Sequence, residues 1–321
     1  MKDYDAAELL NFFRRQLQQP KHPRNPAATP VGLLTAITVD SLVEGVHFPL
    51  ATPPEWVAHK ALAVNLSDLA AMGARPAEIV MALVLPAWDE DWLQRFAQGL
   101  HALFAAWQLR LHNCHVCAGP LSVTIQAHGR VDTAKAMRRS HARPGDQIFV
   151  TGTLGDAACA LPYYLQRQSL PHAHGDFLQQ RLNYPEPRVS TGLRLAGFAH
   201  AAIDISDGLA ADLGHILEES QTGASLHVDK LPASPATQEL LNDEQRIQYQ
   251  LGGGDDFELC FTLPLSHLEW LQDQASTWDV PCTWVGEIVE GTGIDYVMNG
   301  RRIDLDVCGY DHFSTHLQET L

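Results

Sequence analysis

The sequence predicts a mixed α/β protein built from two domains. Helix-like and strand-like segments alternate along the chain, which is the pattern of domains that pack helices on a sheet. The 321 residues are enough for two domains of ordinary size. A strong turn signal, Ala142-Arg143-Pro144-Gly145-Asp146, separates the two alternating halves. We therefore expect a first domain over residues 1–145 and a second over residues 146–321.

The first half carries apolar residues at helical spacing, interrupted by strand-like runs. Pro54 stands at a first helical turn and Gly73 follows the last turn, as expected for a helix between them. The expected elements are a helix over Tyr4–Gln18, a proline-containing loop over Gln19–Thr29, a strand over Leu33–Thr38, a helix over Pro54–Met72, a strand over Ile79–Leu85, a helix over Asp91–Trp107 and a strand over Leu121–Val131.

The second half alternates in the same way after its strong turn. The expected elements are a strand over Gln147–Val150, a helix from Asp156, a strand over Ala201–Ile205, a helix over Gly208–Glu219, strands over Ala224–Val228 and Phe257–Leu263, and a helix over Leu265–Gln274.

Composition and charge restrict the class of partner. Hydrophobic residues make up 45% of the chain and charged residues 19%, as in a folded globular protein. The formal net charge of −16 at pH 7 disfavours binding to nucleic acid or to anionic membranes. A protein this acidic needs metal ions or backbone amide groups in order to hold phosphate.

The sequence also indicates a cellular compartment. Met1–Asp5 lacks the basic start and apolar stretch of a signal peptide. The most apolar run, Ile79–Pro86, is too short to cross a membrane. The six cysteines are scattered along a long chain, so reduced thiols are expected. We therefore expect a soluble cytoplasmic protein.

Short strings of aspartate beside turns are the strongest chemical signal. Thr38-Val39-Asp40-Ser41 follows an expected strand, and a carboxylate at the carboxyl end of a strand can meet a metal or ligand. A turn or cap is the alternative interpretation. Asp68 stands inside an alanine-rich apolar helix. A charge buried there needs a partner or a metal, whereas a residue that faces solvent needs neither.

Three further strings stand at junctions of expected elements. Ile203–Leu209 places two carboxylates and a hydroxyl before a helix whose amino end attracts phosphate, although Ser206 or Asp207 also fits a plain N-cap. Gly252–Leu259 joins consecutive acids to three glycines, which let a backbone approach a ligand closely. Gly309–Phe313 offers an aromatic platform for a ring or, as the alternative, an anchor for the terminal segment.

Together these strings resemble the thiamine-monophosphate kinase family, which belongs to the superfamily of aminoimidazole ribonucleotide synthetase. The matching stretches keep the order and spacing of the family from about Leu33 to the C-terminus. They are TVDSLVEGVHF (38–48), HKALAVNLSDLAAMGARP (59–76), RRSHARPGD (138–146), VTGTLGDAA (150–158), AIDISDGLAADLGHI (202–216), GGGDDFELCFT (252–262) and GYDHF (309–313).

The resemblance implies a two-domain α/β fold and a homodimer that pairs through its N-terminal domains. It also implies that the γ-phosphoryl group of ATP passes directly to thiamine monophosphate, with several magnesium ions bridging the phosphates. Such catalysis rests on positioning and on the neutralisation of charge, which suits a site made chiefly of aspartates.

The resemblance further implies roles for particular residues. Those that match family metal ligands are Thr38, Asp40, Asp68, Asp204 and Asp207, with Asp40 and Asp207 as catalytic residues. Those that match contacts to ATP are Arg139 and Ser206. Those that match contacts to thiamine monophosphate are His47, Asp255 and Tyr310, with Tyr310 in the place of the aromatic ring partner.

Two motifs of the family are absent. His22–Pro30 contains no acid where the family has a Gly-Asp-Asp loop that binds magnesium. Asn113-Cys114-His115-Val116 replaces a Gly-Gly-Asp-Thr loop, so that His115 stands in the place of a metal-binding Asp. A second hypothesis is therefore a paralogue that binds thiamine phosphates without turning over ATP. A third, another ATP-using synthetase of the superfamily, is disfavoured by the matches on the thiamine side.

The replaced segment invites a zinc or redox interpretation. It contains His112, Cys114, His115 and Cys117 within six positions. This spacing is too compact for all four side chains to reach one tetrahedral ion easily, and no second Cys/His pair is evident. The default interpretation is a loop with packed or solvent-facing side chains.

Overall fold

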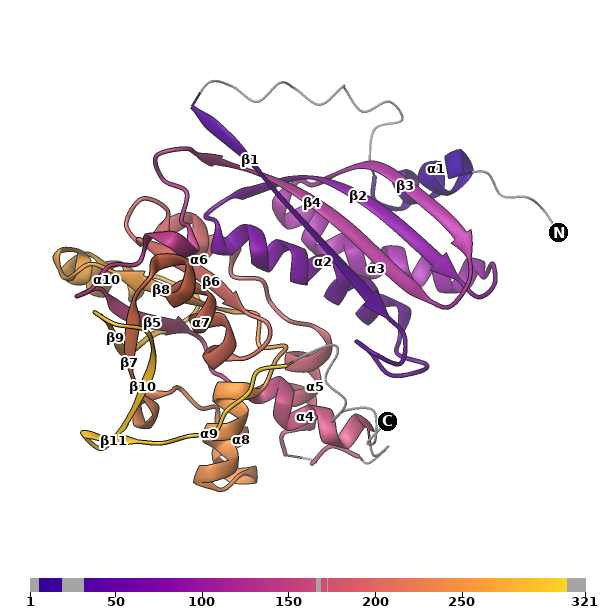
Figure 1. The fold of residues 1–321 in the computed structure, drawn as a ribbon. Helices are drawn as coiled ribbons and strands as arrows, with labels where there is room; N and C mark the ends of the chain where they lie inside the picture. The colour runs from indigo at the N-terminus through magenta and orange to yellow at the C-terminus, as the bar shows by residue number, and fades with distance from the viewer. Residues whose placement is uncertain (1–5, 19–31, 166–168, 172, 311–321) are drawn as a thin grey trace. The chain divides into compact units, whose positions relative to one another are not determined.

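The computed structural model describes residues 6–18, 32–165, 169–171 and 173–310, which form two compact units (Figure 1). Unit 1 comprises the described residues within Met1–Leu69, Ala74–Ala134 and Asn183–Val189, and unit 2 those within Ala70–Gly73, Lys135–Leu182 and Ser190–Leu321. Each unit is built on a sheet of its own that packs against helices. The predicted mixed α/β class is therefore confirmed.

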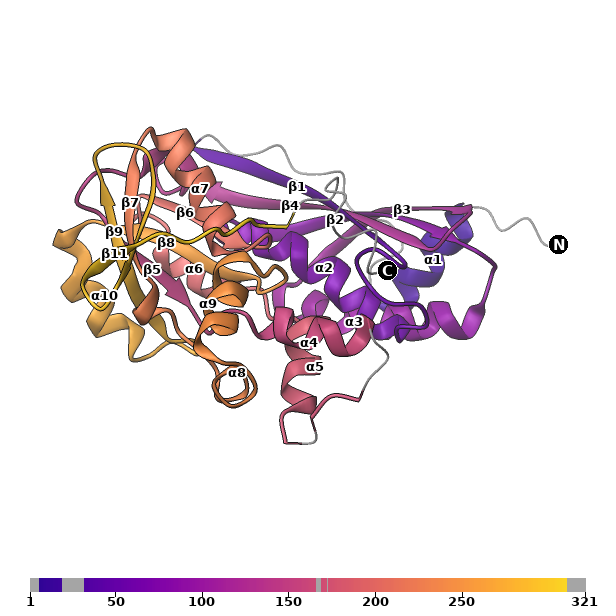
Figure 2. The same ribbon diagram turned by 60° about the horizontal axis from the view of Figure 1, so that its bottom comes forward.

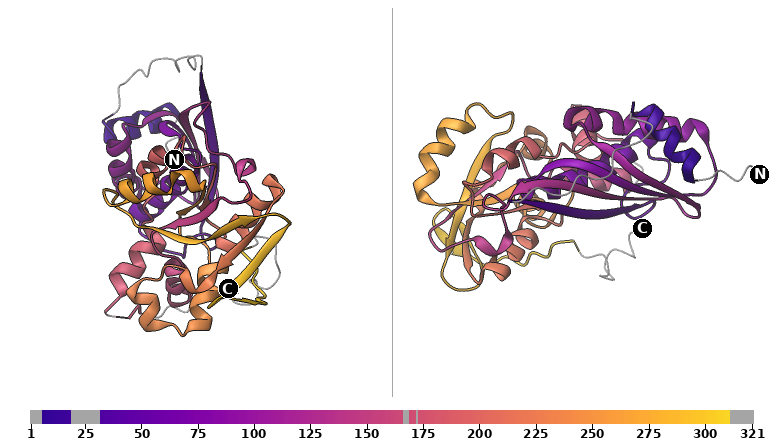
Figure 3. Two further views of the ribbon diagram at one scale, coloured as in Figure 1. Left: turned by 90° about the vertical axis from the view of Figure 1, so that its left-hand side faces the viewer. Right: turned by 90° about the horizontal axis from the view of Figure 1, so that it is seen from above.

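Unit 1 contains a four-stranded sheet in the order β1-β4-β2-β3. The strands are β1 (Leu33–Val43), β4 (Ser122–Asp132), β2 (Arg75–Leu85) and β3 (Arg110–Ala118). The β1–β4 and β4–β2 pairs are antiparallel, and the β2–β3 pair is parallel. Both views in Figure 3 show β1, the indigo strand, at one edge of this sheet.

The helices of unit 1 cover one face of the sheet. Helices α2 (Pro54–Ala71) and α3 (Glu90–Trp107) lie on the same side of it (Figure 2), and α1 (Ala6–Gln16) lies beside β3. Every second residue of β4 is buried, as expected for a strand with one face against helices. On the other face, β1 exposes Ile37 and Val39 at 58% and 62%. Among the described helices, none is long and apolar enough to span a membrane.

Unit 2 contains a seven-stranded sheet in the order β11-β10-β7-β9-β5-β8-β6. The strands are β5 (Gln147–Thr151), β6 (Ala201–Ile205), β7 (Gly223–His227), β8 (Glu258–Leu263), β9 (Cys282–Val289), β10 (Gly293–Met298) and β11 (Arg301–Ile303). The β7–β10 pair is parallel and the other neighbouring pairs are antiparallel.

Helix α7 (Leu209–Ser220) supplies the main core of unit 2 by packing buried leucines and isoleucines on β5, β6 and β8. The other helices are α4 (Asp156–Leu165), α5 (Gly175–Asn183), α6 (Val189–Leu195), α8 (Pro235–Leu240), α9 (Asp243–Gly252) and α10 (Leu268–Ala275). Short 3-10 turns are η1 (Arg139–His141), η2 (Val228–Lys230) and η3 (Leu265–His267).

Most of the expected elements are confirmed with shifted ends. The helix expected over Leu265–Gln274 is a 3-10 turn followed by α10. Tyr4 and the loop expected over Gln19–Thr29 lie outside the described residues. The elements that the sequence pattern did not predict are β3, β9, β10, β11, α5, α6, α8 and α9.

The strand that leads to Asp40 does not end before it, so the predicted position of Asp40 at a strand end is wrong. Strand β1 pairs with β4 continuously from Leu33 to Val43, and Asp40 lies opposite Ile125. The polar residues Thr38, Asp40 and Ser41 do not end the strand, because β1 pairs with β4 along its whole length.

The segment with His112, Cys114, His115 and Cys117 is a strand, so the prediction of a loop is also wrong. Strand β3 pairs in parallel with β2 as far as the Leu85–Ala118 pair. Pairing with a neighbour distant in sequence forms this strand, and local propensity does not reveal such a partner.

Candidate functional site

Thr38, Asp40 and Asp68 lie together in unit 1. Thr38 and Asp40 are two positions apart on β1 and therefore share a face of the sheet. Thr38 Oγ1 donates a hydrogen bond to Oδ2 of Asp68 on α2. Burial, the charge of Asp68 and a hydrogen bond with that carboxyl raise the pKa of Asp40 to about 7. The carboxylates of Asp40 and Asp68 therefore repel each other when both are ionised.

His47 lies in the turn that follows β1. Its ring Nδ1 accepts a hydrogen bond from the backbone N–H of Val43 at 3.0 Å. The backbone N–H of His47 donates to the carbonyl oxygen of Val43 at 2.9 Å. A neutral ring in this arrangement carries its proton on Nε2. Gly45 adopts a φ of 79° in the same turn, a conformation that favours glycine. The turn thus fixes the ring orientation just beyond the strand that carries Asp40.

Asp204, Ser206 and Asp207 lie at the junction of β6 and α7 in unit 2. Asp204 is 5% exposed within β6, whereas Ser206 and Asp207 are half-buried in the turn before α7. Gly208 caps α7 with a φ of 106°, and a Cβ there would lie 2.8 Å from the carbonyl oxygen of Leu251. The close approach of two backbones therefore requires glycine at this position.

Asp212, which the sequence pattern did not single out, holds this turn in place. Its Oδ2 accepts hydrogen bonds from the N–H of Ser206 at 2.9 Å and from the N–H of Asp207 at 3.1 Å. Burial raises the pKa of Asp212 to about 7, although the two hydrogen bonds oppose the rise. The sequence does contain a signal for this role, because Asp212 is an acid in the first turn of the helix that follows Ser206-Asp207-Gly208. The N–H groups before such a helix need an acceptor.

Two distant segments bring Asp255 and Tyr310 to the same turn. The N–H of Asp255 donates to the carbonyl oxygen of Ser206 at 2.9 Å, and the N–H of Tyr310 donates to that of Asp207 at 3.0 Å. A Cβ on Gly254 would lie 2.5 Å from the Ser206 carbonyl oxygen, so only glycine allows this approach. Four residues singled out from the sequence are thus gathered around one turn. Residues 311–313 of the expected aromatic segment lie outside the described residues.

Arg139 lies on η1, which packs beside α7. Its Nη1 is 3.8 Å from Oε1 of Glu219, and its carbonyl oxygen accepts a hydrogen bond from Ser220 Oγ at 2.6 Å. Burial raises the pKa of Asp212, and the positive charge of Arg139 opposes a small part of that rise, so Arg139 acts weakly on the junction of β6 and α7. The side chain is exposed and accessible to an anion.

The donors of unit 1 suit a hard divalent cation. Thr38, Asp40 and Asp68 present oxygen atoms, which are the ligands that magnesium prefers. A cation beside the two carboxylates would offset the repulsion that contributes to the raised pKa of Asp40. Within the described ranges, no three His, Cys, Asp or Glu side chains are grouped to hold a metal. Magnesium would then take its other ligands from water and phosphate, as it commonly does.

The zinc interpretation of β3 finds no support in the described chain. Because β3 is a strand, its neighbouring side chains point to opposite faces. Cys114 is 1% exposed and burial raises its pKa to about 12, whereas His115 and Cys117 are exposed. Two strands separate β3 from β1, which corresponds to roughly 14 Å. His115 therefore does not join the Asp40 group within the described chain.

Both halves of the chain match known domain families. Residues 25–131 match the N-terminal domain of AIR synthase related proteins, and residues 143–299 match their C-terminal domain. The fold and its two aspartate-bearing groups thus define an AIR synthase related protein.

Individual relatives narrow this class. The chain is 44% identical over 282 residues to thiamine-monophosphate kinase of Salmonella typhimurium, with 87% of each chain covered. A crystal structure of thiamine-monophosphate kinase from Stenotrophomonas maltophilia K279a has a TM-score of 0.83 at 39% identity and covers 94% of this chain and 98% of its own. AaThiL complexed with AMPPCP and TMP has a TM-score of 0.77 at 26% identity, with 98% of each chain covered. The chain belongs to the thiamine-monophosphate kinase family.

Proposed function

We propose that this protein uses ATP to phosphorylate thiamine monophosphate, giving thiamine diphosphate and ADP. The observation that carries the proposal is the gathering of Ser206, Asp207, Asp255 and Tyr310 around one turn of a chain that belongs to this family. The complex of AaThiL with AMPPCP and TMP supports ATP and thiamine monophosphate as the two substrates. In the reaction, the bond from the γ-phosphorus to the ADP oxygen breaks and a bond to the acceptor phosphate forms.

The residue roles follow the chemistry of each substrate. Arg139 and Ser206 would bind ATP, and Asp40 and Asp207 would act at the reacting phosphates. Thiamine carries a cationic thiazolium ring, which an aromatic face and a carboxylate attract. Tyr310 and Asp255 are side chains of these two kinds, and His47 adds a hydrogen-bond donor through Nε2.

Magnesium is part of this proposal. The residues that would hold it are Thr38, Asp40, Asp68, Asp204 and Asp207. Bound magnesium would neutralise phosphate charge, which an acidic protein with a net charge of −16 cannot do with its own surface.

A homodimer is also part of the proposal. Strand β1 is an edge strand, and the face of the sheet opposite the described helices of unit 1 exposes Ile37 and Val39. A second copy of the chain would cover this apolar face. Sedimentation equilibrium of the wild type and of Val39→Lys tests it: we expect a dimer and a shift to monomer, and a monomeric wild type would contradict it.

We place the protein in the cytoplasm. All six cysteines lie in the described part of the chain and none forms a disulfide, which suits a reducing compartment. Cell fractionation with an antibody tests this placement.

The decisive assay incubates purified protein with ATP, magnesium and thiamine monophosphate and measures thiamine diphosphate by chromatography. An intact kinase of the family serves as the positive control and Asp207→Asn as the negative control. Absence of product would reject the proposal. Calorimetric binding of thiamine monophosphate without product would support the alternative, a paralogue without ATP turnover, which the comparisons do not favour.

A further inference from the structure

The loop that carries Asp255 is held in a strained backbone conformation. Asp255 has a φ of 68° and Phe257 a φ of 49°, both in the left-handed region. A bulky residue such as phenylalanine rarely adopts this conformation, which is unfavourable and persists only when its surroundings enforce it. The residues around Gly253–Glu258 must therefore hold the loop in place.

One set of contacts comes from backbone groups. The N–H of Phe257 donates to the carbonyl oxygen of Ile205 at 2.8 Å. Between the two strained residues, the buried carboxylate of Asp256 accepts from the N–H of Gly155 at 2.8 and 3.1 Å. The loop is thus bonded both to β6 and to the turn between β5 and α4.

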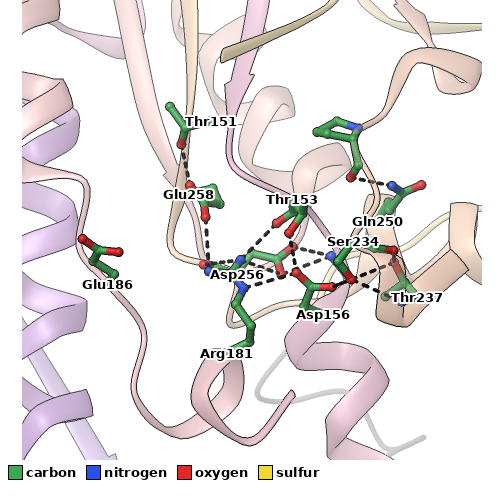
Figure 4. A network of polar contacts seen from close by, with 12 residues as sticks. Thr151, Thr153, Asp156, Arg181, Glu186, Ser234, Thr237, Gln250, Asp256 and Glu258 are labelled. Atoms are coloured by element: carbon green, nitrogen blue, oxygen red, sulfur yellow. Dashed lines mark hydrogen bonds and ion pairs between the residues drawn. The ribbon is translucent and has the colours of Figure 1, made fainter. Parts of the chain in front are cut away.

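A single guanidinium supplies the other set (Figure 4). Arg181 lies on α5 and contacts the β5–α4 turn through two donors. Its Nη2 donates to the carbonyl oxygen of Thr153 at 3.0 Å, and its Nε donates to Oδ2 of Asp156 at 3.2 Å. In the loop, its Nη2 is 3.4 Å from the carbonyl oxygen of Asp256 and its Nη1 is 3.2 Å from Oε1 of Glu258. Arg181 therefore contacts both segments and bridges them.

The charges make this bridge necessary. Asp156, Asp256 and Glu258 are 0%, 1% and 0% exposed. Burial raises the pKa of Asp256 well above its ordinary value, and the positive charge of Arg181 is the main influence that opposes the rise. The three buried carboxylates share Arg181 as their cation. Removal of Arg181 would therefore leave the negative charge in the loop and in the neighbouring turn without this partner.

We propose that Arg181 is a positioning residue for thiamine monophosphate: by bridging the β5–α4 turn and the Gly253–Glu258 loop, it holds Asp255 beside Ser206. This inference rests on the proposed function and names a residue that acts through Asp255 and does not itself touch substrate. A lysine cannot replace the bridge, because one ammonium group lacks the planar fork of donors.

Three variants separate positioning from charge and folding. Arg181→Met removes bridge and cation together. The double variant Arg181→Met/Glu258→Gln removes the bridge and also one buried negative charge. Arg181→Lys keeps a cation without the fork. The matched control is Arg302→Met, which removes an exposed arginine paired with Asp295 at 2.7 Å in the same unit.

KM and kcat are measured for both substrates, together with the calorimetric Kd of thiamine monophosphate and the thermal unfolding midpoint. We expect KM and Kd for thiamine monophosphate to rise about 10- to 100-fold in all three Arg181 variants, because small misplacements at a site have effects of this size. KM for ATP is expected to stay within about twofold. The double variant is expected to unfold at a higher temperature than Arg181→Met without recovering KM.

Wild-type KM and Kd for thiamine monophosphate in folded Arg181→Lys would overturn the inference, as would full recovery of KM in the double variant, because charge alone would then suffice. If the wild type makes no thiamine diphosphate, the proposed function fails, and the Kd series still decides the role of Arg181. A wild type that does not bind thiamine monophosphate overturns both.

Discussion

The backbone N–H of Tyr310 donates a hydrogen bond to the carbonyl oxygen of Asp207 at 3.0 Å. This bond fastens a C-terminal segment to the junction of β6 and α7, although the two residues are far apart in sequence. Tyr310 remains 38% exposed there. An aromatic ring anchored by its backbone, and accessible at its side chain, is suited to receive the ring of a ligand.

Replacing Tyr310 by Ala is expected to raise KM for thiamine monophosphate about tenfold, because a cation–π contact contributes about 1–2 kcal/mol. The backbone bond to Asp207 survives the change, so KM for ATP is expected to stay constant. Steady-state kinetics with each substrate varied in turn measure both values. Tyr310→Phe keeps the ring and serves as the control, and an equal loss in Phe and Ala would argue against a stacking role.

Replacing Asp68 by Asn is expected to slow phosphoryl transfer at least about 100-fold, a loss typical of removing one electrostatic contact at a reacting group. Without metal, the variant is expected to unfold at a higher temperature than the wild type, because the carboxylate that opposes Asp40 is gone. Thermal scans with and without magnesium chloride measure this: the wild type should gain stability from magnesium and the variant less.

The control for Asp68 is Asp91→Asn, which changes an exposed acid on α3. It should retain the response to magnesium. An Asp68→Asn protein that is destabilised without metal and still gains the full stabilisation from magnesium would contradict a metal role for this carboxylate.

Asp212→Ala is expected to destabilise unit 2 by about 1–3 kcal/mol, because the N–H groups of Ser206 and Asp207 lose their acceptor. It should also reduce kcat, since these two residues belong to the proposed ATP and metal site. Asp212→Asn retains a carbonyl oxygen as acceptor and should preserve most of the stability. Urea unfolding of the three proteins tests the order, and equal stability of Ala and Asn would show that the hydrogen bonds matter little.

His59 in unit 1 is expected to make the protein less stable in acid. It is 4% exposed, stacks on Tyr184 with ring centroids 3.3 Å apart, and has its Nε2 2.9 Å from the carbonyl oxygen of Pro185. Burial lowers its pKa from 6.5 to about 4. The unfolded chain therefore takes up a proton at a higher pH than the folded protein does. The stability present above pH 6.5 is lost as the pH falls toward 4, by about 3 kcal/mol in all.

The measurement is the free energy of unfolding as a function of pH. His59→Gln removes the titrating group, so its curve should be flatter than that of the wild type between pH 6.5 and 4. His101→Gln, at an exposed position on α3, is the control and should follow the wild type. Parallel curves for wild type and His59→Gln would rule out this assignment.

The sequence predicted those parts of the fold that depend on local patterns. A proline in the first turn and a glycine after the last turn predict helix α2. The apolar runs of β5 and β6 predict strands without knowledge of the strands that pair with them. The strings around Asp207 and Asp255 are also recognisable locally, because their carboxylates and glycines are adjacent in the sequence. The family could be assigned from such strings because their order and spacing along the chain match those of the family.

Tertiary pairing decided the rest. Asp40 lies within a strand because β4 supplies a partner along all of β1, and the His112–Cys117 segment is extended because β2 lies beside it. The role of Arg181 depends on three buried carboxylates that come from two other segments.

By itself, the sequence determined the fold class, the family and most of the residues with suitable chemistry, because helix ends, turns and aspartate strings are local features. Only the tertiary structure decided which of these residues meet. Hydrogen bonds between distant backbones bring Asp255 to Ser206 and Tyr310 to Asp207, and burial raises the pKa values of Asp40 and Asp212. Contacts and burial of this kind arise only when the chain has folded, so no local pattern records them.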